Sequence, residues 1–138
     1  MTRARGPRAR TRRRYSERTY QRALREYQQG GYDAAMTLFR QFLRQYPKSV
    51  LAGKAQYWIG ESLYGQKQFE AAIVAFDEVN RKYPKDEKVA SAMLKQGFAF
   101  AELGDKRNAR FFLEQVQKKY PNSSEAQLAT EKLKQLRR

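Results

Sequence analysis

The sequence predicts an all-α protein, an α-α superhelix in which three helix pairs stack and a C-terminal helix caps the stack. Three Tyr-Pro pairs recur 37 residues apart, at Tyr46-Pro47, Tyr83-Pro84 and Tyr120-Pro121. Other columns keep the same register: Ala23, Gly60 and Gly97; Ala35, Ala72 and Ala109; Phe39, Phe76 and Leu113; Phe42, Val79 and Val116. A fixed period of roughly 20 to 50 residues is typical of stacked-repeat proteins, which work through their surfaces.

Each unit is expected to hold two helices joined by a short turn. In the middle unit the first helix covers residues 52–66, the turn residues 66–68, and the second helix residues 69–83. Ser49 suits an N-cap, with Asp86 and Ser123 in the same register. Pro84 ends the second helix, because proline cannot continue it. Pairs of Gly and Ala mark where the two helices cross closely, since glycine inside a helix costs about 1 kcal/mol relative to alanine.

The chain divides into a basic tail and one folded domain. Residues 1–14 hold seven arginines and no acid, which leaves +8 of the +15 net charge for residues 15–138. A blocky basic segment containing Gly and Pro is expected to be disordered. The repeats are placed at about 16–48, 49–85 and 86–122, and the capping helix at about 123–138, with Ala126, Ala129, Leu133 and Leu136 as its apolar stripe.

Composition excludes several kinds of chemistry. The chain has no cysteine and no histidine, so thiolate nucleophiles, imidazole bases, disulfides and the usual zinc sites are absent. No phosphate-cradling Gly-rich loop is present, and adjacent acids such as Asp77-Glu78 fit solvated helix faces. We therefore expect no enzyme activity and no cofactor. No apolar run is long enough to span a membrane, and the chain as written shows no secretory signal.

The columns match the consensus of the tetratricopeptide repeat. Gly60, Ala72, Phe76, Val79 and Pro84 follow its spacing in the middle unit. The other two units repeat the pattern with Ala23, Ala35, Phe39, Phe42 and Pro47, and with Gly97, Ala109, Leu113, Val116 and Pro121. Each unit exceeds the usual repeat by about three residues, roughly one more helical turn.

The amino-acid sequence of the repeats indicates a narrower family than the repeat consensus does. Two segments and three turns resemble the C-terminal domain of the periplasmic Tol-Pal system protein, the cell-division coordinator CpoB (YbgF) family. The segments are AQYWIGESLYGQKQFEAAIVAF and AELGDKRNARFFLEQVQKKYPNSSEAQLA, and the turns are YPKS, YPKD and YPNS. This resemblance implies a periplasmic adaptor that binds TolA and couples outer-membrane constriction to septal peptidoglycan synthesis by a synthase. The trimer-forming coiled coil of full-length members is missing here and the Arg-rich tail is foreign to the pattern, so trimerisation is not carried over, although another oligomer stays open.

In this fold the first helix of each unit lines a concave groove, whose aromatic residues are the natural binding candidates. The predicted protein-binding residues are Tyr20, Leu24, Tyr27, Tyr57, Trp58, Glu61, Tyr64, Leu94 and Phe98. Some of them could equally pack between neighbouring helices, and Trp58 in particular could anchor the repeats. A carboxylate clamp would need Lys and Asn where Tyr20 and Leu24 stand, so a less acidic, more apolar ligand is expected.

Two other functions compete with the adaptor. A scaffold of an outer-membrane assembly machinery also uses long tetratricopeptide units, but its lipoprotein member needs an N-terminal cysteine. The Arg-rich tail could bind nucleic acid through phosphates, bind an anionic membrane or glycan surface, or be a linker or cloning remnant without a role. No aromatic residues interleave its arginines, so a base-stacking platform is lacking and no nucleic-acid partner is expected.

Overall fold

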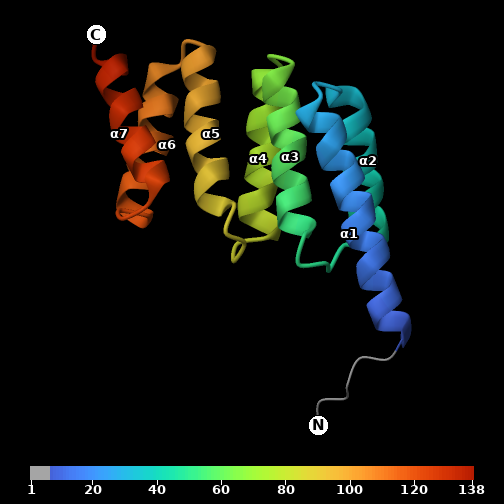
Figure 1. The fold of residues 1–138 in the computed structure, drawn as a ribbon. Helices are drawn as coiled ribbons and strands as arrows, with labels where there is room; N and C mark the ends of the chain where they lie inside the picture. The colour runs from blue at the N-terminus through green and yellow to red at the C-terminus, as the bar shows by residue number, and fades with distance from the viewer. Residues whose placement is uncertain (1–6) are drawn as a thin grey trace.

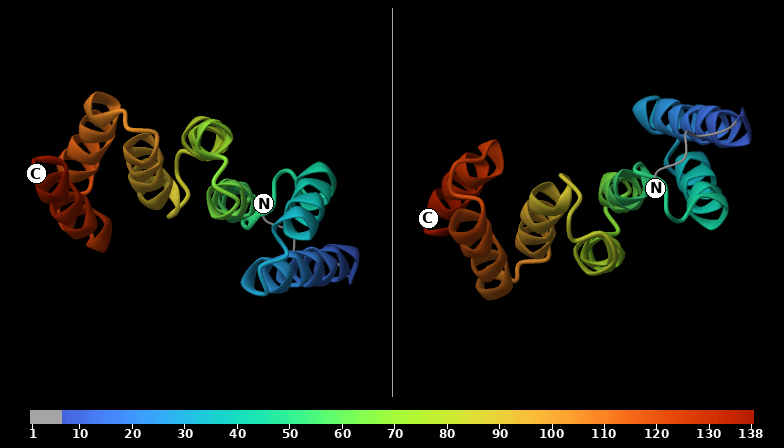
Figure 2. Two further views of the ribbon diagram at one scale, coloured as in Figure 1. Left: turned by 90° about the horizontal axis from the view of Figure 1, so that it is seen from above. Right: turned by 90° about the horizontal axis from the view of Figure 1, so that it is seen from below.

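This computed structural model describes residues 7–138, which form seven helices stacked side by side as antiparallel pairs, from α1 at the right of Figure 1 to α7 at the left. The helices are α1 (Pro7–Gln28), α2 (Tyr32–Gln45), α3 (Ala52–Gly65), α4 (Phe69–Lys82), α5 (Val89–Glu102), α6 (Lys106–Lys119) and α7 (Ser124–Leu136). Viewed along the helices, α1, α3, α5 and α7 form the inner row of a shallow arc, and α2, α4 and α6 form the outer row (Figure 2). The predicted all-α superhelix with a C-terminal capping helix is confirmed.

The crossing of the two helices in each unit depends on the small residues of the repeat. A Cβ atom on Gly60 would lie 2.5 Å from Cδ1 and Cε1 of the Phe76 ring, and one on Gly97 would lie 2.7 Å from Cδ2 of Leu113. Phe76 and Leu113 are both fully buried. The helix backbones therefore approach as closely as the predicted Gly columns require.

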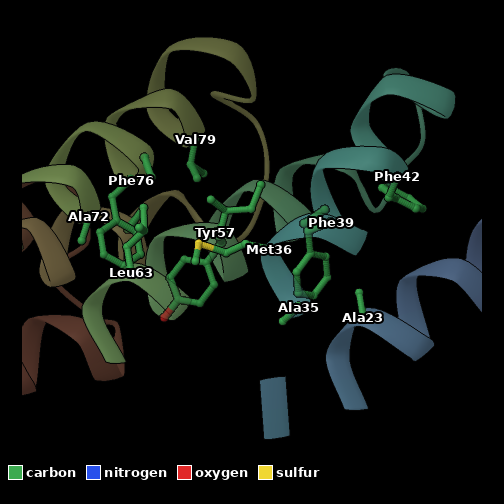
Figure 3. Packing of buried hydrophobic residues seen from close by; sticks show 14 of the residues in the cluster. Ala23, Ala35, Met36, Phe39, Phe42, Tyr57, Leu63, Ala72, Phe76 and Val79 are labelled. Atoms are coloured by element: carbon green, nitrogen blue, oxygen red, sulfur yellow. The ribbon is translucent and has the colours of Figure 1, made fainter. Parts of the chain in front are cut away.

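The core runs between the rows of helices rather than around one centre (Figure 3). Its larger part contains Phe39, Phe42, Tyr57 and Phe76, with the ring centroids of Tyr57 and Phe76 5.6 Å apart. A second part lies under α7, where Ala129 and Leu133 pack with α5 and α6 residues. This arrangement is expected of a solenoid, because each unit buries its apolar face against its neighbours.

The Tyr-Pro pairs end the outer helices in one repeated way. Tyr46, Tyr83 and Tyr120 are the C-cap residues of α2, α4 and α6, with φ near −130° and ψ 56° in each. Each tyrosine donates its backbone N–H to the carbonyl oxygen four residues earlier, and the following proline cannot extend the helix.

The turns inside the three units also share a conformation. Gly30, Lys67 and Gly104 occupy equivalent positions and have φ of 82°, 62° and 78°. Glycine adopts this left-handed region freely, whereas a residue with a Cβ pays for it. Lys67 therefore occupies a position that suits glycine.

Two of the three predicted N-caps are wrong in detail. Ser123 is the N-cap of α7, and its hydroxyl accepts a hydrogen bond from the Ala126 N–H at 3.0 Å. Ser49 and Asp86 instead accept from residues only two positions ahead, Leu51 at 3.1 Å and Lys88 at 2.8 Å. They fold the approach to α3 and α5 into a local turn, and the helices start a few residues later.

The predicted disorder of residues 1–14 is wrong where the structure describes them. Helix α1 begins at Pro7 and runs through the arginine-rich segment, whereas residues 1–6 lie outside the described residues. Arginine and alanine are good helix formers, and proline is tolerated in the first turn. Arg12 also ties the segment down, because its Nη2 donates to the Gln45 carbonyl at 2.7 Å and its guanidinium lies 4.9 Å from the Tyr46 ring centroid.

None of the helices within residues 7–138 combines the length and the apolar character needed to cross a membrane.

Candidate functional site: an aromatic and lysine-lined inner face

The inner row of helices brings together aromatic and charged side chains from successive units. We call this surface the inner face, defined by Tyr27 and Leu24 of α1, Trp58, Glu61 and Tyr64 of α3, Lys88, Lys95 and Phe98 at and within α5, and Lys132 of α7. Its members touch across helices: the ring centroids of Tyr27 and Trp58 lie 4.9 Å apart. All nine side chains are half-buried, so each keeps part of its surface open to a partner.

Three of the predicted binding residues are core residues instead. Tyr20, Tyr57 and Leu94, which share one register, are 5%, 6% and 3% exposed. Tyr20 packs edge-on against Phe39, with ring centroids 5.8 Å apart. The prediction that these three offer their side chains to a partner is wrong, because this register points toward the outer row of helices rather than away from it.

The packing role weighed for Trp58 exists, and it leaves part of the indole exposed. Trp58 Nε1 donates a hydrogen bond of 2.8 Å to the Tyr20 hydroxyl, which links α3 to α1. The ammonium group of Lys88 lies 5.3 Å from the indole centroid and 4.9 Å from the Tyr57 ring. Trp58 therefore anchors the first two units and contributes to the inner face.

Glu61 is the acidic centre of the inner face. Its side chain is 11% exposed, and its Oε1 lies 3.2 Å from Lys95 Nζ in an ion pair, although that oxygen meets no hydrogen-bond geometry with any described residue. Burial, and then the charge of Glu61, raises the pKa of Tyr27 to about 12. Burial also raises the pKa of Tyr64, with Glu102 and Glu61 adding to it. These tyrosines stay neutral hydrogen-bond donors at physiological pH.

The lysines of the inner face are not among the binding residues predicted from the sequence. Lys95 Nζ lies 4.7 Å from the ring centroid of Tyr64 and 6.0 Å from that of Phe98. Phe98 also has a second ammonium group near it, because Lys132 Nζ lies 5.9 Å from its ring centroid. A signal for them existed, because Lys95 and Lys132 follow Trp58 at the 37-residue period. Their presence alters the expected ligand: apolar groups remain suitable, and carboxylates now have cations to meet.

The remaining predicted residues, Leu24, Tyr27, Trp58, Glu61, Tyr64 and Phe98, stay predictions as partner contacts. Together with the neighbouring lysines, their aromatic faces and the half-buried carboxylate of Glu61 are suited to binding a polypeptide segment. Within the described residues no group of three or more His, Cys, Asp or Glu side chains is placed to hold a metal ion.

Two cavities lie away from the inner face. One, of about 710 Å³, is lined by the first turns of α1 and by residues 46–51, and Arg12, Lys48 and Leu51 are among its walls. The other, of about 680 Å³, opens on the outer row between α2 and α4 over Ile59 and Leu63 of α3. The first cavity exists because α1 starts about two turns earlier than α3 and α5 do in their units.

The repeat family is shown by two separate matches. Family models described as tetratricopeptide repeat match residues 20–87 and residues 91–123, which together cover most of the chain. The chain therefore belongs to the tetratricopeptide-repeat proteins, a class whose domains mediate protein–protein interaction.

Individual relatives are similar over different lengths. A 42-residue stretch is 48% identical to the cell division coordinator CpoB of Pseudomonas putida, and this stretch is 30% of the chain and 16% of that protein. The chain thus matches only a small part of the curated relatives' length. The crystal structure of the type III secretion translocator chaperone SycD from Yersinia enterocolitica is similar with a TM-score of 0.76 at 18% identity, covering 88% of this chain and 91% of that one. At that identity the likeness shows the fold alone.

Proposed function

We propose that this chain is a noncatalytic adaptor domain of the Tol-Pal system, which binds a TolA-like partner on its inner face in the periplasm. In this role it coordinates outer-membrane constriction with septal peptidoglycan synthesis, and a peptidoglycan synthase is a second partner. Support for the assignment comes from the sequence resemblance of the repeats and from the local 48% identity to a cell division coordinator. The observation that carries the binding role is the continuous surface made by Trp58 and Tyr64 of α3 and by Lys95 and Phe98 of α5.

The partner segment is expected to carry both apolar side chains and carboxylates. Aromatic rings offer large contact area at low entropic cost, and half-buried rings lose the remaining water when a ligand covers them. Lys88, Lys95 and Lys132 sit over aromatic faces, where a carboxylate from the partner meets a positioned cation. Glu61 already pairs with Lys95, so it disfavours acidic groups directly above it and sets the register of the segment.

The binding test uses Trp58 as an internal probe, because it is the only tryptophan of the chain. A soluble periplasmic domain of TolA is titrated while Trp58 emission and, separately, the heat of binding are followed. The variant Tyr64→Ala/Phe98→Ala removes two rings from the inner face and should weaken binding by at least about 10-fold. A matched pair, Val74→Ala/Phe111→Ala, removes exposed apolar side chains from the outer helices α4 and α6 and should leave affinity unchanged.

The outcomes separate two claims. Equal weakening by both pairs, or no effect of the inner-face pair, would refute the inner face as the binding surface. No binding of TolA by the parent chain would refute the Tol-Pal assignment, whereas the repeat class and its fold would stand.

A further inference from the structure

Helix α1 carries a straight row of arginines that no other helix covers. Arg10, Arg14, Arg18, Arg22 and Arg25 follow one another at spacings of four, four, four and three residues. Residues so spaced lie on one side of a helix, here over a length of about 22 Å. We call this row the arginine face. All five side chains are exposed, and none forms an ion pair with any residue in the described part of the chain.

The repeat itself shows what this side of the helix does elsewhere. The equivalents of Arg18, Arg22 and Arg25 are Ala55, Ile59 and Ser62 in α3, and Ala92, Gln96 and Ala99 in α5, and all six are buried, with at most 4% of the residue exposed. In α5 this side packs on the preceding outer helix, since Gln96 Nε2 donates to the Ile73 carbonyl of α4. In α1 the same side is the open end of the stack, as Figure 2 shows.

A polar end is required of any repeat stack, but a uniformly basic one is not. The opposite end shows a mixed solution: α7 exposes Glu131 and Lys134, whose charged atoms pair at 3.5 Å. On α1 the only acids are Glu17 and Glu26, and neither breaks the row. Like charges four residues apart on a helix repel one another, so the arginine face costs stability that a polyanionic partner would return.

We propose that the arginine face docks on an anionic phospholipid surface, with the axis of α1 parallel to the membrane. A planar array of headgroups can meet all five guanidinium groups at once, because the end of the stack is open along the length of α1. Guanidinium groups bind phosphate oxygens in a bidentate fashion. Tyr15, which is 56% exposed beside the row, has the amphipathic ring that favours the headgroup level.

The same observations disfavour other polyanions. Single-stranded nucleic acid needs stacking platforms, and Tyr15 alone does not provide a series of them. The phosphates of a duplex follow a helical track, so a straight row of guanidinium groups meets only a few of them. Because no large aliphatic side chain lies in the row, docking is shallow and electrostatic, which makes it reversible and sensitive to salt.

The experiment compares two charge-matched variants of the whole chain. Sedimentation is measured with vesicles of phosphatidylcholine alone and with about one-third phosphatidylglycerol, at about 0.1 M salt. The parent should bind only the anionic vesicles. Arg18→Gln/Arg22→Gln/Arg25→Gln should weaken that binding by about 100-fold, as expected for three arginines near an anionic surface. The control Arg110→Gln/Lys118→Gln/Lys119→Gln removes the same charge from exposed positions of α6 and should weaken it by less than about 5-fold.

Every alternative result is decisive. Failure of the parent to bind anionic vesicles, or an equal loss in the two triple variants, would overturn the proposal. Tighter binding to a short DNA duplex or to polyglutamate at the same salt would reassign the face to nucleic acid or to an acidic protein. Circular dichroism checks that both variants remain helical. The arginine face shares no residue with the inner face, so TolA binding can fail or succeed independently of this result.

Discussion

The tight packing of Gly60 in α3 against Phe76 in α4 predicts a large effect from a substitution that adds a single methyl group. In Gly60→Ala the new Cβ would lie 2.5 Å from two atoms of the Phe76 ring and 3.0 Å from a third. Ordinary contact would need the ring to move by roughly 1 Å. Phe76 is fully buried, its neighbours Ala72 and Val79 are also fully buried, and the centroid of the Tyr57 ring lies 5.6 Å from that of Phe76. The ring therefore has no space to enter.

The magnitude follows from two opposing contributions. Replacing glycine by alanine inside a helix stabilises it by about 1 kcal/mol. Overpacking a core costs typically about 1 to 3 kcal/mol, and the upper end or beyond applies where a ring is enclosed on all sides. We expect Gly60→Ala to lower the free energy of unfolding by about 2 kcal/mol, which corresponds to a fall in Tm of about 8 °C for a chain of this size.

The assay is urea and thermal unfolding followed by circular dichroism, with two comparisons. Gly97→Ala should cost less, because its Cβ meets the flexible end of Leu113 rather than a ring. Adding Phe76→Leu to Gly60→Ala should recover stability, with a coupling of about 1 kcal/mol in the double-mutant cycle. If Gly60→Ala were as stable as the parent, close helix contact would not be the reason for glycine in this column.

Three further predictions concern turns, hydrogen bonds and pH. Lys67→Gly should stabilise the chain by about 1 kcal/mol, because Lys67 has φ of 62° where the equivalent residues are Gly30 and Gly104; loss of stability on urea unfolding would contradict this. Trp58→Phe should cost about 1 to 3 kcal/mol, because the buried Tyr20 hydroxyl loses its indole donor, and an unchanged Tm would show that the hydrogen bond is dispensable. Folding raises the pKa of Tyr27 from 10.0 to about 12. The resulting contribution to stability is fully present below pH 10 and is lost as the pH rises through about 12. Alkaline unfolding of Tyr27→Phe should therefore be less steep over that range than that of the parent, and identical curves would exclude the contribution.

The local elements could be predicted because their signals are repeated in the chain. Three copies of the Tyr-Pro pair and of the Gly/Ala columns each report the same helix end and the same crossing, so a chance match in one copy is corrected by the others. The N-caps are harder to predict, since Ser49 and Asp86 lie three residues before the first residues of α3 and α5 and can serve either a cap or a turn. The arginine-rich segment is helical although its charge pattern predicts disorder, because arginine and alanine favour a helix and because Arg12 is anchored on Gln45, a residue 33 positions away.

The binding surface also combines a feature that the sequence predicts with one that depends on how the helices pack. Tyr57 and Trp58 are neighbours in sequence and both aromatic, yet Tyr57 is in the core and Trp58 reaches the inner face. A rotation of about 100° per residue separates them, and which direction is buried depends on the angle at which the next helix packs. Lys95 and Lys132 became part of the surface for the same reason.

By itself, the sequence determined the all-α repeat architecture, the ends of the outer helices, the close crossings at Gly60 and Gly97, and the absence of thiol and imidazole chemistry. These depend on local preferences and on periodicity, which are properties of the chain alone. Only the tertiary structure decided which aromatic residues remain accessible, that Glu61 pairs with Lys95, and that the arginines of α1 form one uncovered row at the end of the stack. Those features depend on which helix lies next to which, and on where the stack has no neighbour.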